Sequence, residues 1–161
     1  MYIYMLLLLI IQIEFVMVML MDENFMKIAI EEAKIAYKND EIPVGCAIFC
    51  DGMLISKAHN CREVTNNSIM HAEIVAISDA CKKLCSWRLN NCTLYVTLEP
   101  CMMCMGAIIE SRIKKVYFGT KNNSEQMYDK DMIKNTVDVE LIENCECSKL
   151  LSDFFKNKRK K

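Results

Sequence analysis

The chain has 161 residues, of which 53% are hydrophobic and 25% charged, and its formal net charge is −1. This composition excludes an intrinsically disordered chain, and the length suits one domain with its own core better than two. A near-neutral charge gives the molecule as a whole no strong attraction for a polyanion, but basic residues are concentrated at positions 156–161.

Residues 1–20 are almost entirely hydrophobic and are interrupted only by Gln12 and Glu14. About 20 apolar residues can span a bilayer, but a central glutamate disfavours insertion by on the order of 3 kcal/mol. The basic segment and small-residue cleavage site of a signal peptide are missing. Three interpretations stay open: a mis-assigned start with Met21 as the true first residue, a membrane segment, or a packed extension. The predicted parts of the chain are a hydrophobic extension (1–21), a folded domain (22–158) and a basic tail (156–161).

After this extension, the hydrophobic pattern predicts a helix from Asp22, whose side chain can cap it, to about Asn39. A strand over 44–50, the turn pair Asp51-Gly52 and a returning strand over 53–58 predict a β-hairpin. The elements predicted further along are a polar loop (60–69), a helix (72–84), a strand (93–98), a helix (100–110), two strands (115–119 and 137–142) and a helix (148–158). This order predicts an α/β fold in which one mixed five-stranded sheet carries helices on both faces.

Ten cysteines are many for a chain of this length. Disulfide scaffolds are the rival interpretation, but they are usually shorter, rich in loops and secreted. Most cysteines here lie within apolar or amphipathic segments, where a free thiol packs as a small hydrophobic group. We therefore predict a reduced, cytoplasmic protein.

One histidine and two cysteines form the most informative pattern in the chain. His71-Ala72-Glu73 stands at the start of one predicted helix, and Pro100-Cys101-Met102-Met103-Cys104 stands at the start of the next. Three such side chains can bind zinc and leave its fourth tetrahedral position open for chemistry. The same pair of motifs is typical of zinc enzymes that remove an amino group from a nucleobase.

Helix geometry gives a reason for these spacings. Cys101 and Cys104 are three residues apart, so on one helix they share a face, and the helix N-terminus favours their ionisation. If two neighbouring parallel strands each lead into a helix, the two N-termini lie side by side and His71 meets both thiols. Glu73 is then the predicted proton shuttle, which takes a proton from zinc-bound water and passes it to the ring as hydroxide attacks the carbon that bears the amino group.

Structural or redox uses of these residues are the competing interpretations. A lone Cys-x-x-Cys occurs in both kinds of site, and a structural zinc needs a fourth ligand. His59 and the pairs Cys81/Cys85 and Cys145/Cys147 are available, but their spacings match no standard zinc knuckle. We therefore interpret His59 as a strand-end or loop residue and favour the catalytic zinc.

Several longer stretches of residues 22–158 narrow the function further. They are Glu41-Ile42-Pro43-Val44-Gly45, His59-Asn60, His71-Ala72-Glu73, Leu94-Tyr95-Val96-Thr97-Leu98-Glu99-Pro100-Cys101, Ser111-Arg112-Ile113 and Leu150-Leu151-Ser152-Asp153-Phe154-Phe155. In these stretches the chain resembles the bacterial tRNA-specific adenosine deaminases of the cytidine deaminase-like superfamily. The zinc motifs are common to several base deaminases, whereas the flanking stretches are more typical of the tRNA enzymes.

The resemblance implies a three-layer α/β/α cytidine deaminase-like fold and a homodimer that converts the wobble adenosine, position 34 of a tRNA, to inosine. It implies one zinc ion per subunit at His71, Cys101 and Cys104, attack of zinc-bound hydroxide on C6 of the flipped-out adenine, and Glu73 as the proton shuttle. Asn60 matches the family asparagine that hydrogen-bonds the flipped-out nucleotide. The further substrate-binding residues that it implies are Val44, Ala72 and Pro100.

One segment departs from the family pattern. After the strand end at Gly119 the family usually has Gly-Ala-x-Asp-x-Lys-x-Gly and a longer insert, whereas this chain has Thr-Lys-Asn-Asn-Ser-Glu-Gln over 120–126 and a shorter connection to the next strand. In the family this region lies near the tRNA, so the departure bears on RNA binding rather than on zinc. Phosphate contacts give affinity without sequence information, which suits the basic tail. The residues predicted to contact tRNA are Arg112, Lys121, Asn122, Lys158, Arg159 and Lys160.

Two other functions stay open. A deaminase of free cytosine, cytidine or guanine would share the zinc motifs without needing a basic tail. A non-catalytic zinc- and RNA-binding protein would keep its metal and its fold but would be indifferent to the loss of Glu73.

Overall fold

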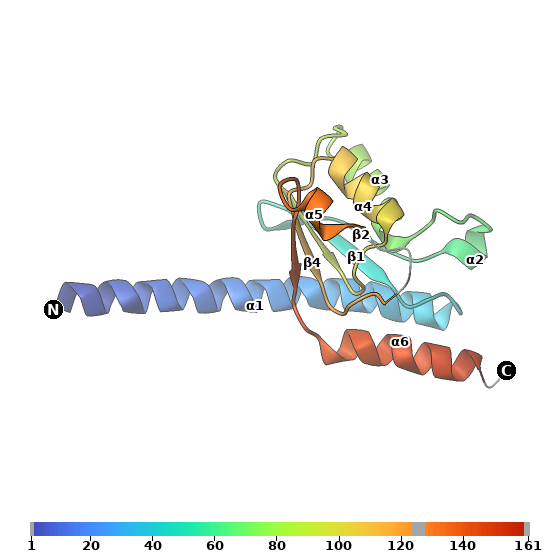
Figure 1. Cartoon of the computed structure of the whole chain (residues 1–161), viewed down its shortest axis with the longest axis horizontal. Helices are drawn as coiled ribbons and strands as arrows, with labels where there is room; N and C mark the ends of the chain where they lie inside the picture. Colours follow the sequence, from blue (N-terminus) through green and yellow to red (C-terminus); the bar gives the residue numbers. More distant parts are fainter. Residues whose placement is uncertain (1, 124–127, 160–161) are drawn as a thin grey trace.

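The computed structural model describes residues 2–123 and 128–159 (Figure 1). Its strands are Gly45–Cys50 (β1), Met53–His59 (β2), Cys92–Val96 (β3), Lys115–Phe118 (β4) and Asp138–Leu141 (β5). They form one five-stranded sheet in the spatial order β2-β1-β3-β4-β5. β1 is antiparallel to both β2 and β3, whereas β3, β4 and β5 are parallel to one another. The predicted mixed sheet is confirmed.

Helices cover both faces of this sheet. They are Tyr2–Lys38 (α1), Arg62–Thr65 (α2), Ala72–Lys83 (α3), Met102–Glu110 (α4), Lys130–Ile133 (α5) and Cys145–Lys158 (α6). On one face, α3 and α4 enclose a core that contains Leu94, Val96 and Val116. On the other face, α1 and α6 cover Phe49 and Tyr95, and Figure 1 shows these two helices side by side. The three-layer α/β/α fold is therefore confirmed.

Most predicted elements are confirmed to within a few residues. The Asp51-Gly52 pair has positive φ at both positions, 49° and 78°, as the predicted hairpin turn requires. α6 begins earlier than predicted because the side chain of Asn144 accepts hydrogen bonds from the backbone N–H groups of Glu146 and Cys147. α2 and α5 have four residues each, which is too short for a hydrophobic period, so the sequence did not predict them.

The predicted start of the first helix at Asp22 is wrong. Asp22 lies inside α1, and its carboxylate accepts a hydrogen bond from the hydroxyl of Tyr95 instead of capping a helix. Neither proline nor glycine interrupts residues 1–38, so nothing in the sequence ends the helical run between the apolar segment and the domain. The large hydrophobic side chains that the structure describes between Tyr4 and Met21 are exposed, and Figure 1 shows this half of α1 extending beyond the sheet.

The membrane interpretation of residues 1–20 depends partly on the side chains at positions 15, 18 and 19, which lie outside the described part of the structure. Among the residues that are described, no helix is long and apolar enough to cross a membrane. The division of the chain at residue 21 stays a prediction, with its three interpretations open.

α1 comes very close to the sheet at Gly45, the first residue of β1. A Cβ atom at this position would lie 2.0 Å from the carbonyl oxygen of Ala29 and 2.4 Å from the backbone nitrogen of Ala33. Both alanines are 0% exposed, so small residues stand on both sides of the contact. The obstructing atoms belong to helix backbone and cannot rotate aside, which is why only glycine fits here.

We expect Gly45→Ala to lower the free energy of unfolding by about 3 kcal/mol or more, because the added methyl group would force α1 away from β1. Gly106→Ala is the matched control. Gly106 lies within α4, a Cβ there would meet nothing within 4 Å, and alanine favours a helix over glycine by about 1 kcal/mol. Thermal unfolding of the three proteins checks the prediction; an equal melting temperature for Gly45→Ala and the parent chain would contradict it.

Candidate metal centre and active site

Two residues that immediately precede helices form the centre of the site. His71 is the N-cap of α3, with φ −74° and ψ 154°, and Cys101 is the N-cap of α4, with φ −78° and ψ 172°. Neither side chain makes a capping hydrogen bond to its own helix, so both are directed to other partners. The prediction that Pro100 and Cys101 belong to the helix is corrected: α4 begins at Met102, after an extended Cys101.

The strands that lead to these helices are not neighbours, which corrects a second expectation. β2 precedes α3 and β3 precedes α4, and both run antiparallel to β1, which lies between them. β2 and β3 are therefore parallel to each other but one strand apart. The connection from His59 to Ala72, which contains α2, spans this distance and brings the two helix N-termini together.

Three possible metal ligands converge at this point. The ligand atoms of His71, Cys101 and Cys104 all lie within 4.8 Å of one another. His71 Nδ1 is 3.7 Å from Cys101 Sγ and 3.5 Å from Cys104 Sγ. Tetrahedral zinc with ordinary Zn–S and Zn–N bond lengths would hold such atoms ~3.6 Å apart. The spacing of the three side chains thus fits a zinc ion with one position left open.

The two thiols differ in the direction in which their surroundings shift the pKa. A hydrogen bond from Cys104, together with one to His71, lowers the pKa of Cys101 to about 4. The hydrogen bond to Cys101 and burial raise the pKa of the Cys104 thiol. Hydrogen bonding to its neighbours thus favours the thiolate at Cys101, and a zinc ion would favour it at both cysteines because thiolate is the form that binds metal.

Glu73 is the second residue of α3, and its carboxylate lies beside the three ligands. It is 3% exposed, and its Oε2 atom has no hydrogen-bond partner among the described residues. Burial raises the pKa of this carboxyl group. A buried polar atom without a partner is costly, so this one marks a place where a ligand is needed. A water molecule in the open position of a zinc ion would satisfy it.

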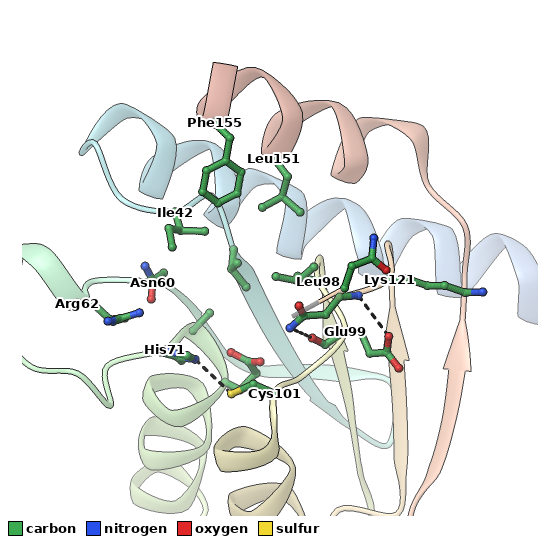
Figure 2. A pocket seen from close by; sticks show the side chains of 15 residues that line it. Ile42, Asn60, Arg62, His71, Leu98, Glu99, Cys101, Lys121, Leu151 and Phe155 are labelled. Atoms are coloured by element: carbon green, nitrogen blue, oxygen red, sulfur yellow. Dashed lines mark hydrogen bonds between the residues drawn. The ribbon is translucent and has the colours of Figure 1, made fainter. Parts of the chain in front are cut away.

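His71, Cys101 and Glu73 line a cavity of about 430 Å³ (Figure 2), whereas Cys104 is 0% exposed and does not line it. Of the residues predicted to bind substrate, Val44, Asn60 and Ala72 line this cavity, whereas Pro100 does not. Pro100 is buried behind the chain that leads to Cys101. The cavity wall also contains residues that the sequence did not single out for this role: Ile42, Arg62, Leu98, Glu99, Asn123, Leu151 and Phe155.

Leu151 and Phe155 reach this cavity from α6, near the other end of the chain (Figure 2). Together with Ile42 and Leu98 they make an apolar wall opposite the ligands. Their only signal in the sequence was that they belong to stretches that match the family. Periodicity could not have placed them, because α6 packs on the opposite face of the sheet from α3 and α4.

Two basic residues lie at the cavity. Lys121 is exposed at its edge, as predicted for an RNA contact. Arg62 stands beside Asn60, and its Nε atom is buried without a hydrogen-bond partner among the described residues. Asn122 also lines the cavity, and both its backbone and its side chain bond to Glu99 at 3.3 Å. Residues 124–126 of the departing segment lie outside the described residues.

Arg112, Lys158 and Arg159 are the other predicted tRNA contacts that the structure describes, and they do not line the cavity. The Arg112 guanidinium is 5.9 Å from the centre of the Trp87 ring, and neither residue lines the cavity. Lys158 pairs with Asp40 at 2.7 Å on the surface, and Arg159 follows the end of α6. Lys160 lies outside the described residues.

The sequence pattern of the cytidine and deoxycytidylate deaminase zinc-binding region matches residues 19–120. The chain belongs to this deaminase family. The match includes His71, Glu73, Cys101 and Cys104, so the ligand geometry and the family agree on one zinc ion per chain. This deaminase is therefore a zinc enzyme, as its motifs predicted.

Relatives of the deaminase narrow its place in the family. The tRNA-specific adenosine deaminase of Bacillus subtilis (strain 168) is 42% identical over 152 residues, which cover 89% of this chain and 94% of the relative. A solved structure from studies of A-to-I editing by tRNA:A34 deaminases has a TM-score of 0.72 at 31% identity, covering 80% of this chain and 99% of that one. Guanine deaminase from Bacillus subtilis has a TM-score of 0.59 at 38% identity, covering 62% and 64%. The predicted resemblance to the tRNA-specific enzymes is confirmed.

We expect Cys104→Ser to weaken zinc binding by more than the roughly 10–100-fold that follows the loss of a hydrogen-bond partner of a ligand. A serine hydroxyl does not ionise at neutral pH and cannot replace the thiolate. Cys85→Ser, at an exposed cysteine, is the control and should keep one zinc ion per chain. Competition with a chelator measures both affinities, and an unchanged affinity in Cys104→Ser would exclude the proposed ligand set.

Proposed function

We propose that this deaminase converts the wobble adenosine, position 34 of a tRNA anticodon, to inosine. The observation that carries the proposal is the buried, unpartnered Oε2 atom of Glu73 beside His71, Cys101 and Cys104, in the wall of one cavity. This arrangement provides an open metal position and a proton carrier at the same place. The similarity to tRNA-specific adenosine deaminases supports adenosine in tRNA as the substrate.

Glu73 would move the protons of the reaction. Zinc at His71, Cys101 and Cys104 would supply an activated water molecule for attack on C6 of adenine. The Glu73 carboxylate would take up a proton from this water at Oε2 and donate it to the ring nitrogen. It would then take a second proton from the hydroxyl group that has added to C6 and donate it to the amine, which leaves as ammonia while the C6 carbonyl forms. Its raised pKa favours holding a proton during each transfer.

The remaining cavity residues would hold the adenine that has been turned out of the anticodon loop. Ala72 and Val44 offer apolar contact near the ligands, and Asn60 offers a polar group to the nucleotide. Leu151 and Phe155 would cover the far side and exclude bulk water. An enclosed base pocket of this kind gives specificity for one nucleotide, while RNA outside it contributes affinity.

Positive charge at the cavity favours an RNA substrate over a free base. Arg62 and Lys121 line the cavity, and the phosphates on either side of a bound nucleotide would provide both with a partner. A free base carries no phosphate and would leave both side chains without a role. Guanine deaminases share the fold of this chain, so we treat deamination of free guanine, cytosine or cytidine as the alternative that the assay must exclude.

We also propose a cytoplasmic homodimer. Met102 and Trp87 are more than half exposed on the α3–α4 side of the sheet, and a second copy of the chain could cover them. Aromatic side chains and methionine are enriched at such interfaces.

Incubation of the zinc-loaded protein with an arginine tRNA that carries adenosine 34 tests the function directly. We expect inosine at position 34 and no reaction with free adenosine, guanine or cytidine. Glu73→Gln should keep zinc and melting temperature but lose at least about 10²–10⁴-fold in rate, because the amide cannot carry a proton. Sequencing of the tRNA reports inosine. Inosine formation at the parental rate by Glu73→Gln would reject the mechanism, and reaction with a free base alone would reject the substrate.

We expect Lys158→Ala/Arg159→Ala to weaken tRNA binding and to reduce the slope of log Kd against log salt by between about 1 and 2, since each phosphate contact contributes about 0.7 to 0.9. Lys82→Ala/Lys83→Ala removes the same charge from the C-terminal end of α3, about 18 Å along the helix from His71. This control should leave the slope unchanged. Equal slopes for the two double variants would exclude an RNA contact at the basic tail.

A further inference from the structure

Glu41 is a buried carboxylate that does not line the cavity but holds a residue that does. It is 1% exposed. Its Oε2 atom accepts a hydrogen bond from Asn60 Nδ2 at 3.0 Å, and its Oε1 atom accepts one from the backbone N–H of Val64 at 2.9 Å. A buried carboxylate is costly unless its oxygens are satisfied, and these two bonds satisfy one oxygen each.

The end of α1 places Glu41 at this position. Asp40 has a left-handed backbone with φ 61°, and the backbone N–H of Glu41 donates to the carbonyl oxygen of Ala36 at 3.0 Å. These two features are typical of a helix C-terminus at which a residue in the left-handed conformation is followed by a backbone hydrogen bond to the last helical turn. The geometry turns the chain sharply and directs Glu41 toward the end of β2, where Asn60 follows His59.

The hydrogen bond to Glu41 decides which way the Asn60 amide faces. An asparagine side chain has a donor end, the NH₂ group, and an acceptor end, the carbonyl oxygen. Only the donor end can face a carboxylate, because the acceptor end would place two oxygens against each other. The Oδ1 atom of Asn60 is therefore the end left for the cavity, and no described residue donates to it. Figure 2 shows Asn60 on the same wall as Arg62 and His71.

We infer that Glu41 is a positioning residue that holds the Asn60 amide with its oxygen toward the cavity, so that Asn60 accepts a hydrogen bond from a donor group of the target nucleotide. The inference rests on the proposed function, because it assigns Asn60 a partner in that substrate. It also explains why a carboxylate is retained at a site where a hydrophobic residue would be less costly to bury.

Glu41 has a structural role as well, and the two roles must be separated. Through Val64 it supplies a capping acceptor to α2, whose own N-cap, Cys61, makes no side-chain hydrogen bond. Loss of the carboxylate could therefore disturb the whole connection between β2 and α3. The substitutions Glu41→Gln and Asn60→Asp separate the two roles. They exchange hydrogen-bond donors and acceptors at positions 41 and 60 while keeping the size of both side chains.

In Glu41→Gln, the new amide can still accept from Val64 through its oxygen, but it offers an N–H group to Asn60. Asn60 must then turn to present its oxygen to Gln at position 41, which leaves its NH₂ group facing the cavity. Asn60→Asp alone would place two carboxylates against each other. The double variant restores one donor and one acceptor between the two positions and again leaves an oxygen for the cavity.

Deamination of an anticodon stem-loop with adenosine 34 is measured for the parent chain, the two single variants, the double variant and one control, with zinc content and melting temperature recorded for each. We expect Glu41→Gln to lose about 10–100-fold in kcat/KM, as for the loss of a charge-assisted hydrogen bond, with zinc retained. The double variant should be at least about tenfold more active than the product of the two single losses predicts. Glu63→Gln, an exposed carboxylate on α2, is the control and should match the parent chain.

Unchanged activity in Glu41→Gln, or strict multiplication of the two single losses in the double variant, would overturn the inference. A purely structural role through Val64 gives no rescue, because Asn60→Asp does not change the hydrogen bond between Val64 and position 41.

The side-chain amide signals of Asn60 in an NMR spectrum give a readout that needs no substrate. One amide proton should be strongly shifted downfield in the parent chain and should lose that shift in Glu41→Gln. An Asn60 amide with the shifts of a solvated side chain would reject the inference. If the parent chain makes no inosine while the downfield proton is present, the proposed substrate is wrong and the position of Asn60 stands.

Discussion

The chemistry of this deaminase depends on two helix N-termini that meet above the same end of the sheet. His71 and Cys101 both have extended backbones directly before a helix, which leaves their side chains free of the helix and directed toward each other. Once these two residues are in place, Cys104 follows within the first turn of α4 and Glu73 within the first turn of α3. Four functional groups thus require only two correctly placed chain segments. The positive ends of both helix dipoles also favour the negative charge that zinc thiolates and Glu73 bring to this point.

The helices on the other face of the sheet, α1 and α6, also position residues of the site. α1 lies directly on β1 because Gly45 and Ala29 leave no side chain between them. That close packing places the end of α1, and with it Glu41, next to Asn60. α6 packs beside α1, and its residues Leu151 and Phe155 line the cavity. The pocket is thus formed by elements from both faces of the sheet, and damage to the α1–β1 contact should affect substrate binding as well as stability.

Local signals explain how much of this could be predicted. The Asp51-Gly52 turn, the alternation of helices and strands and the two zinc motifs all act over a few residues, and the structure confirms them. The predicted start of α1 at Asp22 was wrong because an N-cap residue marks a helix start only where the preceding residues are not helical. The residues before Asp22 contain no proline or glycine and continue the same helix. The predicted helix start at Pro100 was also wrong. Cys101 has an extended backbone, so α4 begins two residues later, at Met102.

The sequence by itself determined the zinc site: a histidine and two cysteines at these spacings supply three zinc ligands, with the glutamate that we propose as proton carrier beside them, because ligand type and helix spacing are local properties. Only the tertiary structure decided what surrounds them. β1 lies between the two strands that lead to the ligands, Leu151 and Phe155 reach the cavity from α6, and Glu41 orients Asn60. These contacts join residues from distant parts of the chain across a sheet, and their geometry depends on how whole elements pack rather than on any short pattern of residues.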